Sequence, residues 1–413
     1  MNLVQIALRY SRDRWFPNLL TAACVSLGVA LLIAVIVLTR GVKEGLLLET
    51  SPYEMIVGAK GSPTQVVLST VFFLDVPTGN IPFRVYRDLK QHPRVTLLVP
   101  VNMGDNHKGF RIIGTTPDYF IPVSQLGRRE HRLRVAQGRL FAKEFEAVIG
   151  ATAAREAGLT LGDRFRGIHG FGEGIGEEPD EAHGHREYIV VGILAPSSTA
   201  TDRGIFTTLG SVWSIHGLPP VPLDELLSKG DGPPITALFL RAQSLADLML
   251  LSTQLNAGPE AQAVFPGRIM DQLFTMFGTG ETILEVIAIM VLFVAAITIS
   301  LSVFGATTER RREMATLRAL GASPGTLVQL LLWESAMISL LRALAGFGLG
   351  RGAAYAASRI IEASSGIYVP TWQFSVLEPV LLGAMALVGI LAGLIPGLTA
   401  YRMEVADHLT PLA

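Results

Sequence analysis

The stretch Thr307–Thr326 has the sequence TTERRREMATLRALGASPGT and lies between two long apolar runs. Good helix formers fill Glu309–Leu320, which predicts a short helix. Its apolar residues predict a narrow stripe on a charged surface: Met314, Leu317 and Leu320. Gly321 is placed to end this helix, and Ser323 followed by Pro324 is typical of the first turn of the next one. The stretch therefore predicts a short helix in water that connects two membrane-spanning helices.

The composition indicates a membrane protein with room for a large soluble domain. The chain has 413 residues, 49% of them hydrophobic and 17% charged, and its mean hydropathy is +0.42. Soluble proteins carry about 25% charged residues. A net charge of −1 gives no electrostatic case for nucleic acid as a partner. The one cysteine, Cys24, lies in the first apolar run, so we expect neither a disulfide framework nor a thiolate metal site.

Four apolar runs predict an integral membrane protein with four transmembrane α-helices, arranged as one span, a large domain and then three spans. Pro17–Thr39 carries no charge, and a helix of that length reaches about 35 Å, enough to cross a hydrocarbon core of about 30 Å. A cleaved signal peptide is the alternative, but its apolar core would be shorter and a small-residue cleavage site would follow. The other predicted spans are 286–308, 326–350 and 379–401.

Residues 41–280 predict an α/β domain inserted between the first and second spans. Its β-rich runs predict strands at Glu54–Val57, Gln65–Leu74, Val95–Val101, Phe110–Gly114, Glu146–Gly150, Tyr188–Leu194 and Ile235–Leu240. Helical patterns lie at Phe83–Gln91, Ala142–Gly158 and Ser244–Ala257, with Gly158 expected just past a helix end. We expect the flanks Gly41–Thr50 and Arg268–Glu285 to continue the adjoining spans as a stalk.

Arginines near the span ends set the predicted orientation, because positive charge favours the cytoplasmic side. They are Arg9, Arg12, Arg14, Arg310, Arg311, Arg312, Arg318 and Arg402. With four spans all of them fall on one side, so we expect both termini in the cytoplasm. The predicted domains are then 1–40 (a cytoplasmic amphipathic segment and the first span), 41–280 (the extracytoplasmic domain) and 281–413 (the remaining spans, with a coupling loop at 309–325).

Sequence motifs for chemistry performed by this chain alone are missing. The glycine-rich segment Gly58–Ser62 does not have the spacing of a phosphate-binding P-loop, and Gly170–Gly176 does not fit G-x-G-x-x-G. G-x-S-x-G occurs once, at Gly321–Gly325, but this match stands between two predicted helices and not on a strand-to-helix turn, and H-E-x-x-H does not occur. We therefore expect a non-catalytic membrane subunit. A membrane-anchored enzyme would need a catalytic cluster in 41–280 that the sequence does not reveal.

Thr307–Thr326 has two interpretations from its residues alone. It fits a basic juxtamembrane loop that binds anionic lipid headgroups, since such loops are common beside spans. It also fits a docking element for another protein, with the apolar stripe in a groove of the partner.

A family resemblance favours the second interpretation. ERRREMATLRALGAS at 309–323 closely resembles the cytoplasmic segment of FtsX-like, MacB-type ABC transporter permeases. The tail from Pro396 to Leu409 is similar to the family's terminal pattern, although Val405 stands at or near a position where the family commonly has proline. Val148–Asp163 and Tyr188–Leu194 with Asp202–Thr207 look like parts of the MacB-like periplasmic core domain.

The resemblance implies a permease subunit in the bacterial inner membrane that pairs with a cytoplasmic ABC ATPase and with a second permease copy or paralogue. ATP and magnesium would bind the ATPase, with no cofactor on this chain. ATPase motion would pass through the membrane to the external domain, an action called mechanotransmission, to export or extract an amphiphilic substrate, in some systems with a periplasmic adaptor. The alternative is an FtsX-like signalling module that regulates an extracytoplasmic enzyme. The positions that fit the family's coupling pattern are Glu309, Arg310, Arg311, Glu313, Leu317, Arg318, Ala319, Leu320 and Gly321.

Three smaller features each have two interpretations. The acidic, glycine-rich loop His169–Glu187 offers His169, His183 and His185 as ligands for a divalent metal, or it is a solvated surface loop. Glu334 and Arg342, within the third predicted span, form a polar seam in the membrane or extend to its boundaries. Tyr53–Leu74 lines a substrate path or packs as a strand.

Overall fold

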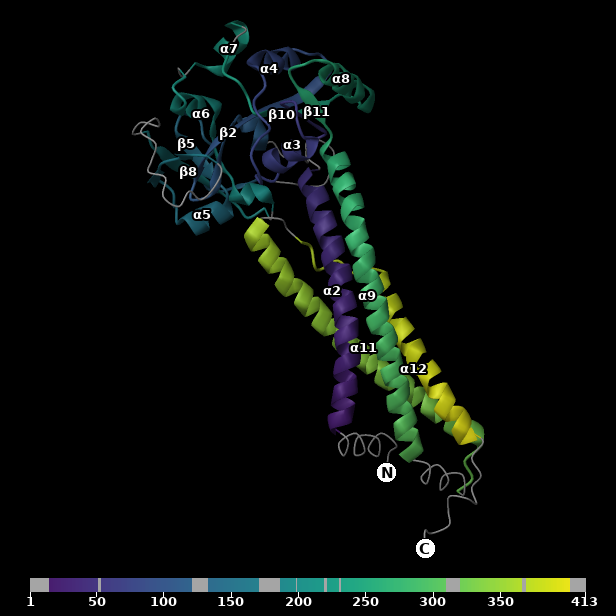
Figure 1. The fold of residues 1–413 in the computed structure, drawn as a ribbon. Helices are drawn as coiled ribbons and strands as arrows, with labels where there is room; N and C mark the ends of the chain where they lie inside the picture. Colours follow the sequence, from purple (N-terminus) through teal and green to yellow (C-terminus); the bar gives the residue numbers. More distant parts are fainter. Residues whose placement is uncertain are drawn as a thin grey trace. The chain divides into compact units, whose positions relative to one another are not determined.

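The computed structural model describes residues 15–50, 53–120, 133–170, 186–197, 199–218, 221–229, 232–309, 320–365 and 369–401. The chain divides into two compact units, one of long helices and one built on a β-sheet (Figure 1). The helical unit comprises Met1–Val42, Phe277–Ile360 and Val369–Ala413, and the sheet unit comprises Lys43–Met276 and Ile361–Tyr368.

The sheet unit contains one sheet, whose strands run in the order β11-β1-β10-β2-β3-β9-β5-β8-β4, with β6 paired to β8 and β7 to β2. Neighbouring strands are antiparallel except for the parallel pairs β3–β9 and β5–β8. The strands are β1 (Met55–Gly58), β2 (Val95–His107), β3 (Phe110–Thr115), β4 (Val135–Gly138), β5 (Glu146–Ile149), β6 (Arg164–Phe165), β7 (Ile168–His169), β8 (Tyr188–Leu194), β9 (Ile205–Thr208), β10 (Ala237–Ala242) and β11 (Gln262–Val264). Six of the predicted β-rich runs are therefore confirmed as strands, and the α/β character of this region with them.

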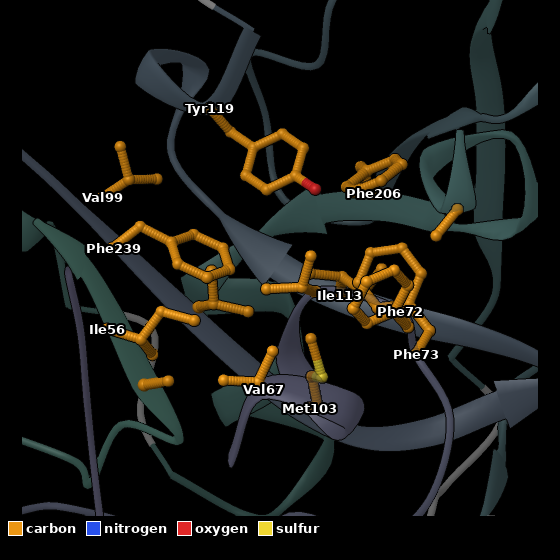
Figure 2. Packing of buried hydrophobic residues seen from close by; sticks show 14 of the residues in the cluster. Ile56, Val67, Phe72, Phe73, Val99, Met103, Ile113, Tyr119, Phe206 and Phe239 are labelled. Atoms are coloured by element: carbon orange, nitrogen blue, oxygen red, sulfur yellow. The ribbon is translucent and has the colours of Figure 1, made fainter. Parts of the chain in front are cut away.

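Strands β1, β3 and β5 are buried on both faces of the sheet, whereas β4 is largely exposed. Successive side chains of a strand point to opposite faces. In β1, Ile56 belongs to one hydrophobic cluster while Met55 and Val57 belong to another. The same alternation holds in β10, where Phe239 joins the cluster of Ile56 and Leu238 joins that of Met55. Figure 2 shows the cluster that contains Ile56 and Phe239, which extends across the sheet and which we call the main core.

One helix on the main core overturns a prediction, because Gln65–Leu74 does not form a strand. Instead α3 covers Pro63–Thr70, with Pro63 in its first turn. The side chain of Ser62 caps it by accepting a hydrogen bond from the Gln65 amide, 3.3 Å from nitrogen to oxygen. The hydroxyl of Thr70 donates to the Val66 carbonyl one turn back, 2.6 Å away. Cap, proline and burial of one helix face together override the strand preference of the β-branched residues.

The other predicted helices are confirmed in whole or in part. α4 (Phe83–Lys90) and α8 (Leu245–Ala257) match their patterns, and Ser244 caps α8. The predicted helix Ala142–Gly158 is shorter: only α5 (Ala151–Ala157) is helical, since β5 occupies the middle of that range. Gly158 ends α5 with φ +71°, as expected of a glycine past a helix end. The remaining short elements are η1 (Pro117–Phe120), η4 (Ala200–Arg203), α6 (Leu209–Ile215) and α7 (Leu223–Lys229).

The helical unit is carried by four long helices (Figure 1): α2 (Trp15–Thr50), α9 (Pro266–Glu309), α11 (Pro324–Ser365) and α12 (Leu377–Tyr401). Among the described residues, three segments are long and apolar enough to cross a membrane: Ala22–Leu46, Pro324–Glu362 and Leu377–Leu394. In α9 the apolar part is the shorter Ile289–Thr298, so the count of four spans stays a prediction. The expected helical continuations at Gly41–Thr50 and Arg268–Glu285 are confirmed, because they lie within α2 and α9.

Candidate functional site

Most of the predicted ATPase-coupling segment lies outside the described residues. α9 ends at Glu309, whose side chain is not described, and the description resumes at Leu320. The predicted coupling residues in between are Arg310, Arg311, Glu313, Leu317, Arg318 and Ala319. Their roles stay predictions.

The C-terminal end of this segment is a turn held against the first turn of α11. Gly321 has φ +98°, a left-handed conformation that favours glycine. Ser323 caps α11, because its hydroxyl accepts a hydrogen bond from the Thr326 amide at 3.2 Å. Leu327 and Leu331 are buried and pack with Ala322 of the turn. The turn is therefore attached to α11 by both a cap and an apolar contact, and the predicted N-cap followed by proline is confirmed.

α11 lies against α2 at two glycines one helical turn apart. A Cβ added at Gly346 would lie 2.5 Å from the Ser26 carbonyl oxygen, and one at Gly350 would lie 2.6 Å from the Ala30 carbonyl oxygen. The hydroxyl of Ser26 donates to the Arg342 carbonyl across the same contact, at 2.9 Å. Small residues spaced in this way let helix backbones approach closely in membranes.

α11 meets α12 through buried serines facing glycines. A Cβ added at Gly389 would lie 2.7 Å from the Ser335 carbonyl oxygen, and Gly393 faces the Ser335 hydroxyl. Ser335 and Ser339 are both buried. The contact surface of α11 thus has two sides, one against α2 and one against α12, and both depend on small residues.

The polar residues predicted inside the third span lie on α11. Arg342 is half-buried, and its backbone carbonyl accepts the hydrogen bond from Ser26. The side chain of Glu334 lies outside the described residues. The buried polar groups that face other helices here are serines, namely Ser26, Ser335 and Ser339, and a pattern of charged residues does not indicate them.

A polar cluster joins α2, α11 and the start of α12, and we call it the polar clasp: Arg40, Arg351, Thr371, Ser375 and Glu378. Arg351 Nη1 donates to Glu378 Oε2 at 2.7 Å, and Nη2 donates to the Thr371 carbonyl at 2.5 Å. The other oxygen of Glu378 accepts the Ser375 amide at 3.0 Å. Arg40 Nη1 donates to the Ser375 hydroxyl at 2.5 Å. Only 1% of the Glu378 side chain is exposed, so this charge is satisfied by protein groups rather than by water.

The polar clasp was not predicted, although the sequence carries a signal for it. Arg40, Arg351 and Glu378 each stand at the end of an apolar run. Opposite charges at the ends of neighbouring spans are candidates for pairing because an unpaired charge there is unfavourable. Which ends lie together depends on the packing of α2, α11 and α12, and the sequence does not state this.

The proposed metal ligands are only partly described. His169 lies in β7, where its backbone stands opposite Asp105 in the register of β2 with β7. His183 and His185 lie outside the described residues. Within the described part of the chain, no group of three or more His, Cys, Asp or Glu side chains could hold a metal ion. The metal hypothesis stays a prediction.

A buried polar group lies beside β7 in the sheet unit. Asp105 is buried, with Oδ1 3.8 Å from Nε2 of His216. Burial and then the nearby Asp105 charge raise the pKa of the Tyr188 hydroxyl above its ordinary value. Burial also lowers the pKa of His107, whose Nδ1 lies 2.8 Å from the Arg166 carbonyl oxygen. The neutral forms of Tyr188 and His107 are thus favoured. Among the described residues, neither side chain belongs to a group that could hold a metal ion.

The aromatic residues of Tyr53–Leu74 are packed in the main core rather than lining an open path. Phe72 and Phe73 are buried there, beyond the end of α3 (Figure 2). The ring of Tyr53 stacks on Phe239 with centroids 4.1 Å apart. The packing interpretation is confirmed, although only Met55–Gly58 of this segment is a strand, and Gln65–Leu74 lies in a helix and a turn.

Two family models match the chain. The MacB-like periplasmic core domain matches residues 18–257, which is more than half of the chain, and the FtsX-like permease C-terminal model matches residues 285–405. The first match therefore includes most of α2 and the sheet unit up to α8, and the second includes α11 and α12 with the predicted coupling segment.

One curated relative and two solved structures illustrate the likeness. The macrolide export ATP-binding/permease protein MacB of Chromobacterium violaceum is 28% identical over 130 residues, which are 31% of this chain and 19% of that protein. The periplasmic region of MacB from Actinobacillus actinomycetemcomitans is 12% identical, with 55% of this chain and 97% of the other covered and a TM-score of 0.34. The extracellular domain of the noncanonic ABC-type transporter YknZ from Gram-positive bacteria is also 12% identical, with 51% and 98% covered and a TM-score of 0.31. The chain thus spans about a fifth of the curated relative's length.

Proposed function

Because the chain belongs to the family defined by the MacB-like periplasmic core domain, and carries an FtsX-like permease region after it, we propose that it is a permease subunit of an ABC transporter in the bacterial inner membrane. ATP would be hydrolysed on a separate ABC ATPase chain, and a second permease copy or a paralogue would complete the assembly. Both termini would lie in the cytoplasm and the sheet unit outside, as the arginine distribution predicts.

ATPase motion would enter at the coupling segment and pass first to α11. The cap at Ser323 and the packing of Ala322 on Leu327 and Leu331 support this step, because they attach the end of the segment to the first turn of α11. α11 in turn has close backbone contacts with α2 at Gly346 and Gly350. No long side chains separate the two backbones at these contacts. A displacement of α11 would therefore be transmitted directly to α2.

The continuity of two helices is the observation that best supports transmission to the external domain. α2 runs unbroken from Trp15 to Thr50, and α9 runs unbroken from Pro266 to Glu309. At one end of these helices Leu46, Ile269 and Met270 pack in the main core of the sheet unit. An unbroken helix transmits displacement along its axis because its backbone hydrogen bonds connect every turn to the next. This is the arrangement that mechanotransmission requires.

The substrate class is proposed on weaker grounds. The curated relative is named a macrolide export protein, and a macrolide is an amphiphilic molecule. Export or extraction of an amphiphile is therefore the function proposed here, with a periplasmic adaptor as a further partner. No feature of the described residues favours the alternative of a signalling module.

Substitution within the predicted apolar stripe tests the coupling proposal. We expect Leu317→Asp to abolish co-purification of the ABC ATPase with the chain and to leave the sheet unit folded, because a charge would occupy the predicted groove contact. The measurement is capture of the tagged full chain from membranes in mild detergent, with the ATPase identified by mass spectrometry. Hydrogen exchange of the sheet-unit peptides reports folding.

Leu245→Asp is the matched control. Leu245 is an exposed leucine at the start of α8 in the sheet unit, so the same change of residue is made away from the coupling segment. We expect this variant to retain the ATPase. Wild-type recovery of the ATPase by Leu317→Asp, or its loss in both variants, would count against the assignment.

A further inference from the structure

The polar clasp marks the same level on three helices of the helical unit. Arg40, Arg351 and Glu378 each end an apolar run in the sequence, and the structure brings them together through Ser375 and one direct ion pair. The apolar runs of three helices end at this one polar cluster. The edge of the hydrocarbon core must therefore lie at the cluster, because a charged group is unfavourable inside the core. The polar clasp therefore identifies a membrane boundary independently of any count of spans.

The lengths of the helices agree with this position. From Pro324 to Arg351, α11 is about 40 Å long, and from Leu377 to Tyr401, α12 is about 37 Å long, at about 1.5 Å of rise per residue. Both lengths slightly exceed a hydrocarbon core of about 30 Å, as expected for helices that reach from one interfacial region to the other.

The loop that supplies Thr371 and Ser375 to the polar clasp exposes apolar side chains on its other side. Trp372 is 77% exposed, Phe374 76% and Val376 79%. They alternate with Thr371 and Ser375, which are buried. Arg351 fixes this arrangement, because its guanidinium binds the Thr371 carbonyl and lies over the Phe374 ring with 4.2 Å to the centroid. We call Trp372, Phe374 and Val376 the aromatic ledge.

We propose that the aromatic ledge inserts into the interfacial region of the leaflet at the clasp end of the helices and anchors this loop to lipid. Tryptophan and other amphipathic aromatic rings favour the level of the headgroups, where an apolar ring and a polar group are both satisfied. Arg40 is exposed at the same level, and its remaining N–H groups are suited to lipid phosphate. This inference rests on the proposed membrane location but not on ATPase coupling.

Continuity with the rest of the helical surface favours lipid over a protein partner. Leu377 and Val380 extend the exposed apolar surface from the ledge directly onto α12, where Leu387 and Leu391 continue it. On the other side, the ring of Tyr355 on α11 lies beside Trp372, with centroids 6.5 Å apart, and is half exposed. Because this apolar surface continues the lipid-facing surface of the helices, it contacts lipid as well. At the level of the ledge, that lipid is the part of the acyl chains next to the headgroups.

Depth-dependent quenching of tryptophan fluorescence tests the proposal in the full chain. The protein is reconstituted into phosphatidylethanolamine and phosphatidylglycerol vesicles that contain lipids brominated near the headgroup or near the chain end. The contribution of Trp372 is obtained as the difference between wild type and Trp372→Phe, a conservative change at an exposed site. We expect this contribution to be quenched at least about twofold more by the shallow label than by the deep one.

Leu341→Trp provides the matched control on α11. Leu341 is 60% exposed and lies about 15 Å along the helix from Arg351, which is half of a hydrocarbon core of about 30 Å. The difference between Leu341→Trp and wild type should therefore be quenched more by the deep label. If the tryptophan at this position behaves in this way, the membrane location holds and the ledge is tested separately.

Three outcomes would overturn the proposal. Quenching of Trp372 by aqueous iodide, with no effect of brominated lipid, would place the loop in water. Stronger quenching by the deep label would contradict the interfacial depth. Protection from both reagents would indicate a protein cover, and disulfide cross-linking of Phe374→Cys in a Cys24→Ser background would then identify a second copy of the chain as that cover.

Discussion

The two units of this protein are packed in different ways. The main core of the sheet unit is made of large side chains. The ring of Tyr119 contacts both Phe206 and Phe239, with centroid distances of 5.0 Å and 6.2 Å. The helical unit instead brings backbones together at small residues such as Gly346 and Gly389. Large side chains on its helices, such as Phe293 and Leu341, are exposed.

The difference follows from the solvent of each unit. In water, burial of apolar surface is worth about 25 cal/mol per Å², so a large aromatic side chain stabilises the fold most. Between helices in lipid this driving force is missing, because acyl chains are as apolar as leucine, and close van der Waals contact with a few hydrogen bonds takes its place. The same residue types therefore stabilise one unit from inside and face the surroundings in the other.

Of the substitutions that test this difference in packing, truncation of an aromatic residue in the main core should change stability the most. We expect Phe206→Ala to destabilise the sheet unit by about 3–5 kcal/mol, because the ring is fully buried and packs edge-on against Phe120 at 5.4 Å. Hydrogen exchange of the β9 and β3 peptides in the full chain measures it. Leu245→Ala at an exposed site should change the stability by less than about 0.5 kcal/mol. Similar protection in both variants would contradict the importance of the aromatic core.

Enlarging a small residue should have the next largest effect, and only in the helical unit. We expect Gly346→Leu to destabilise the contact between α2 and α11 by about 1–3 kcal/mol, since even its Cβ would collide with the Ser26 carbonyl. Gly348→Leu, two residues along the same helix, has no neighbour within 4 Å of the added Cβ and should be neutral or slightly stabilising.

Thermal unfolding of the detergent-solubilised chain compares the two glycine variants, with cross-linking between cysteines on α2 and α11 as a local readout. Equal unfolding temperatures for Gly346→Leu and Gly348→Leu would show that close backbone approach does not stabilise the bundle.

Local features of the fold followed from the sequence. β8 occupies Tyr188–Leu194 as predicted, and Ser323, Gly158 and Ser244 end or begin helices where expected. These features depend on the conformational preferences of a few neighbouring residues, so a single sequence contains the information. α3 was predicted wrongly because its β-branched residues favour a strand locally, whereas packing on the main core and the cap at Ser62 favour a helix.

The polar clasp and the aromatic ledge could not be predicted in the same way. The hydrogen bond from Arg40 to Ser375 joins residues 335 positions apart, and only the packing of the helices brings them together. The exposure of Trp372 likewise depends on a distant residue, because Arg351 binds the carbonyl of the neighbouring Thr371. The coupling segment presents the opposite case, because its pattern is strong in the sequence while most of its residues lie outside the described part of the structure.

The smallest expected change in stability concerns the ion pair Arg139–Glu146 in the sheet unit. Like Arg351–Glu378 in the helical unit, it joins an arginine to a buried glutamate. Glu146 accepts hydrogen bonds from both terminal nitrogens of Arg139 and from the Ala142 amide. The hydrogen bond from Arg139, opposed by burial and helped by the backbone amides, lowers the pKa of Glu146 to about 2. The carboxylate form is thus favoured by folding.

The sign of the pH dependence follows from this lowered pKa. Glu146 contributes its full stability above the ordinary carboxyl pKa of about 4.3, and the contribution disappears as the pH falls towards 2. Because the Arg139 side chain is 54% exposed, solvent screens the pair, and we expect Glu146→Gln to destabilise the sheet unit by only about 1–2 kcal/mol at neutral pH.

Stability of wild type and Glu146→Gln should therefore converge between about pH 4 and pH 2. Denaturant unfolding at a series of pH values measures the gap, with Glu156→Gln as the control because Glu156 lies on the exposed side of α5. A gap that is constant down to pH 2 would mean that the glutamine destabilises through shape rather than charge. The pair would then stabilise the sheet unit by packing, as the aromatic residues do, and the contrast between the two units would extend to their charged groups.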